Sequence, residues 1–475
     1  MTPPPTSAPF DAFHLPGLTE ADVEGRDERE YGREAVRLVV PVLRAGAMTR
    51  IAARVAEAGG AAIRSMRSGD IVASIDAAAR RLLDPEDPLR RVAEAALPAI
   101  TGYSPAMTRL VLDRAVRDWT APALERLLRS EFPGGELERF VPEHGTATRT
   151  MAVPPRLALH IGSGNVPGVA VTSIVRCLLV RAPSIVKTAA GEPLLSVLFA
   201  RALGAVEPRL AEALAVLHWP GGRSTVEDEA IAAADTIVVY GGADTVRSIR
   251  KRAPARARII EHGPRASVGL VGRDALADEA TARATAARAA WAVAMFDQQG
   301  CVSPHVVWVE RAVVDDTAFA ELLGEALDAV EQELPRGALD AAEAAAIHQA
   351  RTRAEFRAMR GEDVSVFEGS AAGWTVIRDA DPAFEPSCLN RTIRIKRVER
   401  LEDAPELIAP LRGFVQSVAV EGAGDRLEPL ARALVAAGAT RITDFRRMPW
   451  PPPAWHHDGA GPLRELVTWT DLETG

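Results

Sequence analysis

The sequence contains few cysteines and no long apolar run, and both absences exclude classes of protein. Its three cysteines, Cys177, Cys301 and Cys388, lie far apart in 475 residues, which fits neither a disulfide framework nor the spacing of a zinc site. No run of 18 uncharged apolar residues occurs, and the start MTPPPTSAPF lacks the basic and apolar parts of a secretory signal. We therefore expect a cytoplasmic protein without a membrane span.

An excess of positive charge is also missing. The 56 lysines and arginines stand against 64 aspartates and glutamates, a formal net charge of −8, so no overall basic field exists to bind nucleic acid. Charged residues at 25% and hydrophobic residues at 47% are close to globular averages, which excludes extensive disorder and collagen-like composition. A length of 475 residues predicts two or three domains, at roughly 150 residues each.

Short apolar runs alternate with helical stretches from about residue 155 onward. Residues 1–25 are irregular and proline-rich, whereas residues 28–128 repeat alanine, arginine and leucine at helical spacings. The apolar runs that predict parallel strands are 157–161, 184–187, 213–218, 236–240, 258–261, 267–271, 305–309, 374–378, 392–398 and 414–420. Between them we expect helices, including a buried one in 166–180 and another over 340–359. This alternation predicts an α/β fold with two parallel-sheet domains.

Small-residue turns follow several of these strands and carry candidate functional residues. In LALHIGSGNVPG, residues 157–168, the turn lets a ligand approach closely, and Asn165 offers an amide donor beside a helix N-terminus. That arrangement suits an oxyanion, although an ordinary turn with Asn165 as a helix cap stays open. The glycine spacing is not that of the dinucleotide motif G-x-G-x-x-G.

Three more strand ends carry polar or glycine residues. Lys187 ends SIVK, where its ammonium could reach a ribose or phosphate, and Gly241-Gly242 follow TIVVY at a helix start that can cradle a pyrophosphate. Glu261 ends RARIIE and could act as a general base. A solvated lysine, a plain turn and a surface carboxylate are the ordinary alternatives.

Cys301 lies in FDQQGCVSP, between a long alanine-rich helix and the strand HVVWV. A cysteine after glycine at such a junction can be exposed and can have the lowered pKa that a thiolate nucleophile needs. Cys177 falls in an apolar helical stretch and Cys388 has no glycine turn beside it. Cys301 is therefore the candidate nucleophile.

Taken in order, these segments resemble the aldehyde dehydrogenase superfamily. Their residue patterns are most similar to those of the LuxC-type acyl-CoA reductases, the fatty-acid reductases known from bacterial bioluminescence. Asn165 in Asn-Val-Pro corresponds to the family's oxyanion-hole asparagine, and Lys187 to its cofactor lysine. The family's Phe-Thr-Gly-Ser cofactor turn matches VYGG at 239–242, which contains Gly241 and Gly242. The likeness is dense from about residue 155 to 310 and looser to about 445.

Two further motifs carry the resemblance to the chemical step. The family's Glu-Leu-Gly-Gly-Lys resembles EHGPR at 261–265, which makes Glu261 the counterpart of the general base. The nucleophile motif, in which Gln and Gly precede Cys, is similar to QGC at 299–301. The later glutamate that holds the nicotinamide ribose has no clean partner, because Glu385 is about two positions out of register.

The resemblance implies an aldehyde dehydrogenase-like α/β fold with two Rossmann-like parallel-sheet domains. We expect an irregular segment (1–25), a helical region plus NADP-binding α/β domain (26–262), a catalytic α/β domain with the cysteine nucleophile (263–447) and a C-terminal arm (448–475). Many NAD-using members have a glutamate three residues after the lysine, where this chain has Ala190. Losing that carboxylate removes repulsion toward a 2′-phosphate, so NADPH is the expected cofactor.

The implied reaction is reduction of a long-chain fatty acyl-CoA or other acyl thioester to the aldehyde, through a thioester on Cys301. A hydrolytic aldehyde dehydrogenase and a non-catalytic nucleotide-binding scaffold are the alternatives. The resemblance also implies a homo-oligomer, a dimer or tetramer, and an acyl-transferring partner protein. The pair His456-His457 with Asp458 does not predict a metal site, because adjacent side chains diverge and no third ligand is near in sequence. Three tryptophans in the last 26 residues favour a tail that packs on another surface.

Overall fold

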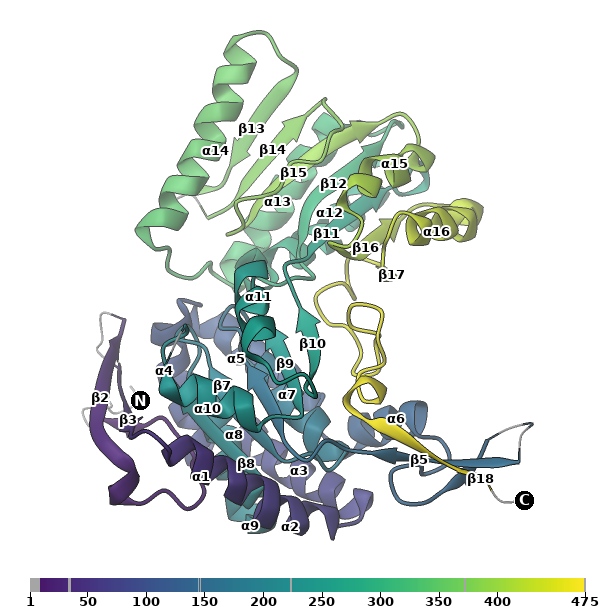
Figure 1. The fold of residues 1–475 in the computed structure, drawn as a ribbon. Helices are drawn as coiled ribbons and strands as arrows, with labels where there is room; N and C mark the ends of the chain where they lie inside the picture. Colours follow the sequence, from purple (N-terminus) through teal and green to yellow (C-terminus); the bar gives the residue numbers. More distant parts are fainter. Residues whose placement is uncertain are drawn as a thin grey trace. The chain divides into compact units, whose positions relative to one another are not determined.

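The computed structural model describes residues 9–32, 36–143, 145, 147–222, 224–370 and 373–473. The chain divides into two compact units (Figure 1). Unit 1 consists of Met1–Thr101, Thr108–Gly263 and Pro452–Gly475. Unit 2 consists of Gly102–Met107 and Pro264–Pro451. The fold is α/β, as the alternating sequence pattern predicts.

Unit 1 is built on a five-stranded parallel sheet in the order β10-β9-β6-β7-β8. Its strands are β6 (Ala158–Ile161), β7 (Ser184–Thr188), β8 (Leu214–His218), β9 (Thr236–Tyr240) and β10 (Arg258–His262). The inner strands are buried almost throughout, which is why they read as continuous apolar runs. The five strands predicted between residues 157 and 261 are confirmed.

Helices join and cover this sheet. Those following its strands are α7 (Val169–Leu179), α8 (Leu195–Val206), α9 (Pro208–Glu212), α10 (Thr225–Ala233) and α11 (Ala243–Arg252). The N-terminal helices are α1 (Ala47–Arg54), α2 (Gly60–Arg64), α3 (Ser68–Leu83), α4 (Pro88–Thr101), α5 (Pro105–Arg117) and α6 (Ala121–Glu131). Because α7 is almost wholly buried, the buried helix predicted in 166–180 is confirmed.

The prediction of helix from residue 28 onward is wrong over residues 28–31 and 36–43. There, β2 (Val23–Tyr31) and β3 (Val36–Leu43) form an antiparallel pair, and β1 (Phe10–Asp11) pairs in parallel with β3. Residues of β2 alternate between half-buried and exposed positions, so its many charged side chains satisfy a strand period rather than a helical one. The segment 1–25, predicted to be irregular, also contains strand, namely β1 and the start of β2.

The C-terminal segment also contains a strand. β18 (Thr468–Glu473) pairs antiparallel with β5 (Thr148–Val153), whose other neighbour is β4 (Val141–Pro142). The proline-rich part before it forms turns. In the described part of the chain, no helix has both the length and the apolar character needed to cross a membrane.

Unit 2 contains a seven-stranded sheet in the order β13-β14-β15-β12-β11-β16-β17. The strands are β11 (Ala266–Val271), β12 (Pro304–Glu310), β13 (Val364–Glu368), β14 (Thr375–Asp379), β15 (Thr392–Val398), β16 (Val415–Glu421) and β17 (Arg441–Thr443). Only the pairing of β13 with β14 is antiparallel. The strands predicted in this region are confirmed, whereas β13 and β17 were not predicted.

Apolar cores cover both faces of this sheet. Helices α12 (Glu279–Ala294) and α13 (Asp316–Glu333) pack with alternate strand residues such as Val307 and Ile395. Helices α15 (Ala404–Ile408) and α16 (Leu427–Ala436) pack with residues such as Val306 and Val418. The helix predicted over 340–359 is confirmed as α14 (Ala341–Met359), which begins with a capping box formed by Asp340 and Glu343.

Candidate active site

Five of the six predicted site residues lie at the carboxyl edge of the unit 1 sheet. They follow or end four neighbouring strands: Asn165 after β6, Lys187 in β7, Gly241 and Gly242 after β9, and Glu261 in β10. Open parallel sheets bind ligands at this edge. The structure therefore gathers residues that are up to 96 positions apart in sequence along one edge of one sheet.

Asn165 is exposed on the loop between β6 and α7. The loop is tied to the next strand, because the backbone N–H of Gly162 donates to the carbonyl of Lys187 at 2.9 Å. It ends at Gly168, whose φ of 93° precedes the first residue of α7 and is readily adopted only by glycine. A side chain there would also meet Ala115 at 3.1 Å. The turn thus places an amide side chain in solvent beside a helix N-terminus.

The residues predicted to bind the cofactor are Lys187 and the glycine pair Gly241-Gly242. Burial lowers the pKa of Lys187, while the charge of Glu227 acts in the opposite direction. Gly242 is the residue before the first turn of α11, and a Cβ built on it would have no heavy atom within 4 Å. Open space at a helix N-terminus fits a phosphate group, so the geometry suits a pyrophosphate at this turn.

Glu261 forms an ion pair with Arg250 of α11. The Arg250 Nε donates to Glu261 Oε1 at 3.1 Å, and its terminal nitrogen contacts the same oxygen. Both side chains are partly exposed. In this conformation the carboxylate is neutralised by a cation and would have to leave the pair to act as a general base.

Charged residues of the N-terminal hairpin also reach this edge, which the sequence analysis missed because it predicted helix there. Asp27 and Arg29 lie on the half-buried face of β2, with Arg29 Nε donating to Asp27 at 2.8 Å. The charges of Arg29, Lys187 and Asp27 all act on His218 at the end of β8. Burial, followed by Arg29, lowers the pKa of His218 to about 4, so this imidazole is neutral at pH 7.

Cys301 lies in unit 2, at the amino edge of the seven-stranded sheet, three residues before β12. It is partly exposed, and its carbonyl accepts a hydrogen bond from Ser267 Oγ at 2.8 Å. Cys177 is buried and burial raises its pKa to about 12, which makes it inert as a thiolate. Cys388 is partly exposed and lies between β14 and β15.

The segment preceding Cys301 has an unusual backbone. Phe296, Asp297 and Gln298 have φ values of 56°, 47° and 64°, and residues 389–391 form a second left-handed run with φ of 68°, 54° and 59°. None of these residues is glycine, so each conformation costs energy that surrounding contacts must offset. Such strain concentrates at functional sites.

Buried polar contacts join the two left-handed runs. Asp297 accepts from Arg391 Nε at 2.9 Å and from the Gly337 N–H at 3.0 Å. The Gln299 amide donates to Asn390 at 3.0 Å, and Gln298 donates to the Pro304 carbonyl at 2.7 Å. Burial raises the pKa of Asp297, while Arg391 opposes that shift. These contacts fix the segment before Cys301, and the contact of Gln298 with Pro304 ties that segment to the start of β12.

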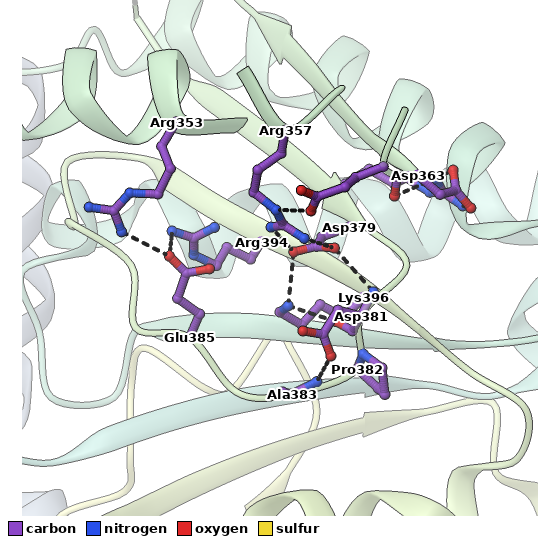
Figure 2. A network of polar contacts seen from close by, with 12 residues as sticks. Arg353, Arg357, Asp363, Asp379, Asp381, Pro382, Ala383, Glu385, Arg394 and Lys396 are labelled. Carbon is purple, nitrogen blue, oxygen red and sulfur yellow. Dashed lines mark hydrogen bonds and ion pairs between the residues drawn. The ribbon is translucent and has the colours of Figure 1, made fainter. Parts of the chain in front are cut away.

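Glu385, which lies near the expected position of the ribose-binding glutamate in sequence, is engaged in ion pairs within unit 2. Figure 2 shows its carboxylate directed at two guanidinium groups: Arg394 at 2.5 Å and Arg353 at 3.7 Å. A neighbouring buried network joins Asp379 to Arg357 at 2.7 Å and to Lys396 at 3.3 Å. These carboxylates balance buried cations, which is a structural role.

The C-terminal turn places His457 and Asp458 beside His262 of β10. The ligand atoms of the three residues lie within 4.8 Å of one another, so β10 supplies the third ligand that the sequence analysis did not find. His262 Nδ1 lies 2.9 Å from Asp458 Oδ2. The imidazole rings are stacked, at 4.3 Å and 10°, so their nitrogen lone pairs run parallel and do not converge on an ion at about 2.1 Å.

Aromatic rings extend this stack on both sides. Tyr240 lies 4.5 Å from the His262 ring, and Trp455 lies 4.6 Å from the His457 ring. The C-terminal segment thereby packs against the strand ends from which Gly241 and Glu261 extend. This packing role fits the rings better than metal binding.

Comparison with solved structures defines the class of protein. NAD-dependent benzaldehyde dehydrogenase from Corynebacterium glutamicum superposes with a TM-score of 0.71 at 18% identity, covering 98% of this chain and 99% of that chain. NADP-dependent glyceraldehyde-3-phosphate dehydrogenase from Bacillus halodurans gives a TM-score of 0.72 at 16% identity, covering 95% and 96%. The chain has the aldehyde dehydrogenase fold.

Sequence comparison defines the family within that class. The profile of the acyl-CoA reductase (LuxC) family matches residues 63–469, and the chain belongs to this family of oxidoreductases. The long-chain acyl-protein thioester reductase of Vibrio harveyi is 24% identical over 383 residues, 78% of this chain and 76% of that protein. Long-chain acyl-protein thioester reductase 2 of Photobacterium leiognathi is 23% identical over 325 residues, 68% of this chain and just under two thirds, 65%, of that protein.

Proposed function

We propose that the protein reduces a long-chain fatty acyl thioester, carried by coenzyme A or by a protein, to the aldehyde with NADPH. The observation that supports this most is Cys301, a partly exposed thiol on a strained loop held by buried contacts. Membership of the LuxC family and relatives that are acyl-protein thioester reductases support the substrate class.

The Cys301 thiolate attacks the acyl carbon, and the departing thiolate leaves the acyl group on Cys301 as a thioester. The amide of Asn165 and the backbone N–H of Cys301 stabilise the oxyanion that forms during attack. Lys187, Gly241 and Gly242 would hold the cofactor, because the backbone N–H groups at the start of α11 favour a phosphate. When bound, reduced nicotinamide supplies a hydride for the acyl carbon.

The surroundings of Glu261 favour reduction over hydrolysis. A hydrolytic dehydrogenase needs a carboxylate that is able to activate water, and Glu261 is paired with Arg250. We propose that Glu261, once released from Arg250, acts as an acid–base group around Cys301, and that the ion pair keeps acyl-enzyme hydrolysis slow while it persists. We further propose a homo-oligomer and a partner protein that delivers the acyl group.

The test is to incubate the purified protein with NADPH and a long-chain acyl-CoA, following loss of NADPH absorbance and identifying the product by mass spectrometry. The expected result is aldehyde formed in proportion to NADPH consumed, with NADH markedly poorer. Conversion of an added aldehyde to the acid with NAD or NADP, and no acyl-CoA reduction, would replace the proposal with the oxidative activity.

A further inference from the structure

Cys301 lies in a β-turn, and the turn itself holds only one of the two peptides that flank this residue. Residues 300–303 form the turn, which the Ser303 N–H closes by donating to the Gly300 carbonyl at 2.9 Å. This bond fixes the peptide between Gly300 and Cys301, whose trans geometry directs the Cys301 N–H away from the bonded carbonyl. The middle peptide, between Cys301 and Val302, has no hydrogen bond within such a turn, and its orientation distinguishes the common turn types.

Ser267 of β11 supplies the hydrogen bond that the turn does not give to the middle peptide. Its hydroxyl is fully buried, donates to the Cys301 carbonyl at 2.8 Å and accepts from the Ser417 N–H of β16 at 3.1 Å. Because a backbone N–H can only donate, the single hydroxyl proton is committed to the Cys301 carbonyl. The register of β11 against β12 shifts between Ser267 and Val268, an irregularity of the kind that redirects a side chain from a strand.

Both peptides that flank Cys301 are therefore held, one by Ser303 and the other by Ser267. The orientations of these two peptides set the backbone torsions of Cys301, and the torsions fix the direction of its N–H relative to its side chain. An oxyanion that forms when the sulfur attacks a carbonyl carbon has to lie about 3 Å from its donor. An N–H that is fixed beforehand needs no reorientation as the negative charge develops.

We propose that Ser267 is a positioning residue, which acts through the Cys301 carbonyl to hold the Cys301 N–H ready for the oxyanion. The proposal rests on the proposed function in taking Cys301 as the nucleophile. During acylation the sulfur–carbon bond forms while an electron pair of the carbonyl moves onto its oxygen, where the N–H stabilises the charge. The pair then returns and the thiolate of the acyl carrier leaves. Ser267 keeps its proton throughout.

Ser417 provides a matched control on the neighbouring strand. Like Ser267 it is fully buried, but its hydroxyl has no hydrogen-bond partner among the residues that the structure describes. Its contact with Ser267 is made by the backbone N–H, which an alanine retains. Ser417→Ala therefore removes a buried hydroxyl from the same part of the sheet while the contact between Ser267 and Cys301 stays in place.

The test measures the rate at which a long-chain acyl-CoA acylates Cys301 in the absence of NADPH, by rapid quench and mass spectrometry of the Cys301 peptide. Ser267→Ala should lower the rate at saturating acyl-CoA by at least about tenfold. The acyl-CoA concentration that gives half the maximal rate should change less than about twofold, because substrate binding is not altered. Ser417→Ala should acylate at the parent rate.

A second pair of variants and a second reagent separate positioning from a general disturbance of the loop. Ser267→Thr and Ser267→Val have nearly the same shape, so Thr should recover most of the acylation rate and Val should be as slow as Ala. Alkylation of Cys301 by iodoacetamide forms no oxyanion at a carbonyl and should stay within about twofold of the parent in Ser267→Ala. Equal slowing of alkylation and acylation would make the role of Ser267 structural and overturn the proposal.

The outcomes distinguish this proposal from the proposed function. Acylation of Ser267→Ala at the parent rate overturns the role of Ser267 and leaves the proposed function intact. Slower acylation in Ser267→Ala, together with no NADPH-dependent reduction by the parent, supports the role of Ser267 and contradicts only the proposed reduction. A parent protein that alkylates at Cys301 but is never acylated there overturns both, because Cys301 would not be the acyl acceptor.

Discussion

Replacing Arg391 with methionine should destabilise unit 2 by breaking its buried ion pair with Asp297, in the segment that precedes Cys301. Arg391 is 1% exposed and contacts Asp297 at 2.9 Å and Glu331 at 2.6 Å. Removing one partner of a buried pair costs about 3–5 kcal/mol, because the other charge stays buried. We expect the lower end, about 3 kcal/mol, because Gly337 still donates to Asp297 and Glu331 is partly exposed.

A double-mutant cycle separates charge from shape. Asp297→Asn keeps the oxygen that accepts from Gly337 and should cost about 1–2 kcal/mol. The double variant Asp297→Asn, Arg391→Met leaves no buried charge at residue 297, so its cost should fall below the sum of the single changes by at least about 1 kcal/mol. Burial raises the pKa of Asp297, so the penalty in Arg391→Met should increase from pH 5 to pH 8.

The assay is urea denaturation of all four proteins, with Cys301 alkylation as a local readout. We expect Arg391→Met to slow alkylation as well, because the left-handed run at residues 296–298 loses its fixed partner. Arg391→Met within about 0.5 kcal/mol of the parent, or a double variant that costs the full sum, would show that this pair does not hold the loop.

Three further results are expected. Burial raises the pKa of Glu192 to about 7 from an ordinary 4.5. Between these two pH values the folded chain holds a proton that the unfolded chain releases, so the free energy of unfolding should fall by up to about 3 kcal/mol from pH 4.5 to pH 7. Urea denaturation across that range should show no such fall in Glu192→Gln. Gly242→Val should raise the KM for NADPH at least about tenfold at an unchanged unfolding midpoint, because its side chain enters open space at the helix start; an unchanged KM would place the cofactor elsewhere. Cys177→Ala should leave turnover and the alkylated peptides unchanged, because that thiol is buried, and lost alkylation of Cys301 would contradict this.

The strands and their carboxyl edge follow from sequence because buried parallel strands are continuous apolar runs. Val238 and Val239 illustrate this, since neither face of β9 meets solvent. The same reasoning fails for β2, whose sequence VEGRDEREY is mostly charged and has only one half-buried face. Because the residues that follow are rich in alanine and arginine, the charged sequence of β2 was interpreted as the exposed face of a helix.

Long-range contacts mark the limit of sequence reasoning at the candidate site. His262 and Asp458 are 196 residues apart, and no local sequence pattern predicts that their side chains are in contact. Phe296, Asp297 and Gln298 have no shared preference for left-handed backbone, which their tertiary contacts impose. The positions of Cys301 and Glu261 were predicted from motifs, whereas the contact of the Ser267 hydroxyl with the Cys301 carbonyl is visible only in the structure.

The central claim is that Cys301 carries the acyl group. The most direct measurement is to mix the protein with a long-chain acyl-CoA in the absence of NADPH, quench at acidic pH and map the acyl adduct by peptide mass spectrometry. The account predicts one acyl group on the Cys301 peptide, removed by hydroxylamine or by adding NADPH with release of aldehyde, and no adduct in Cys301→Ala. An acyl group on Cys388 or another residue, or aldehyde production that persists in Cys301→Ala, would contradict it.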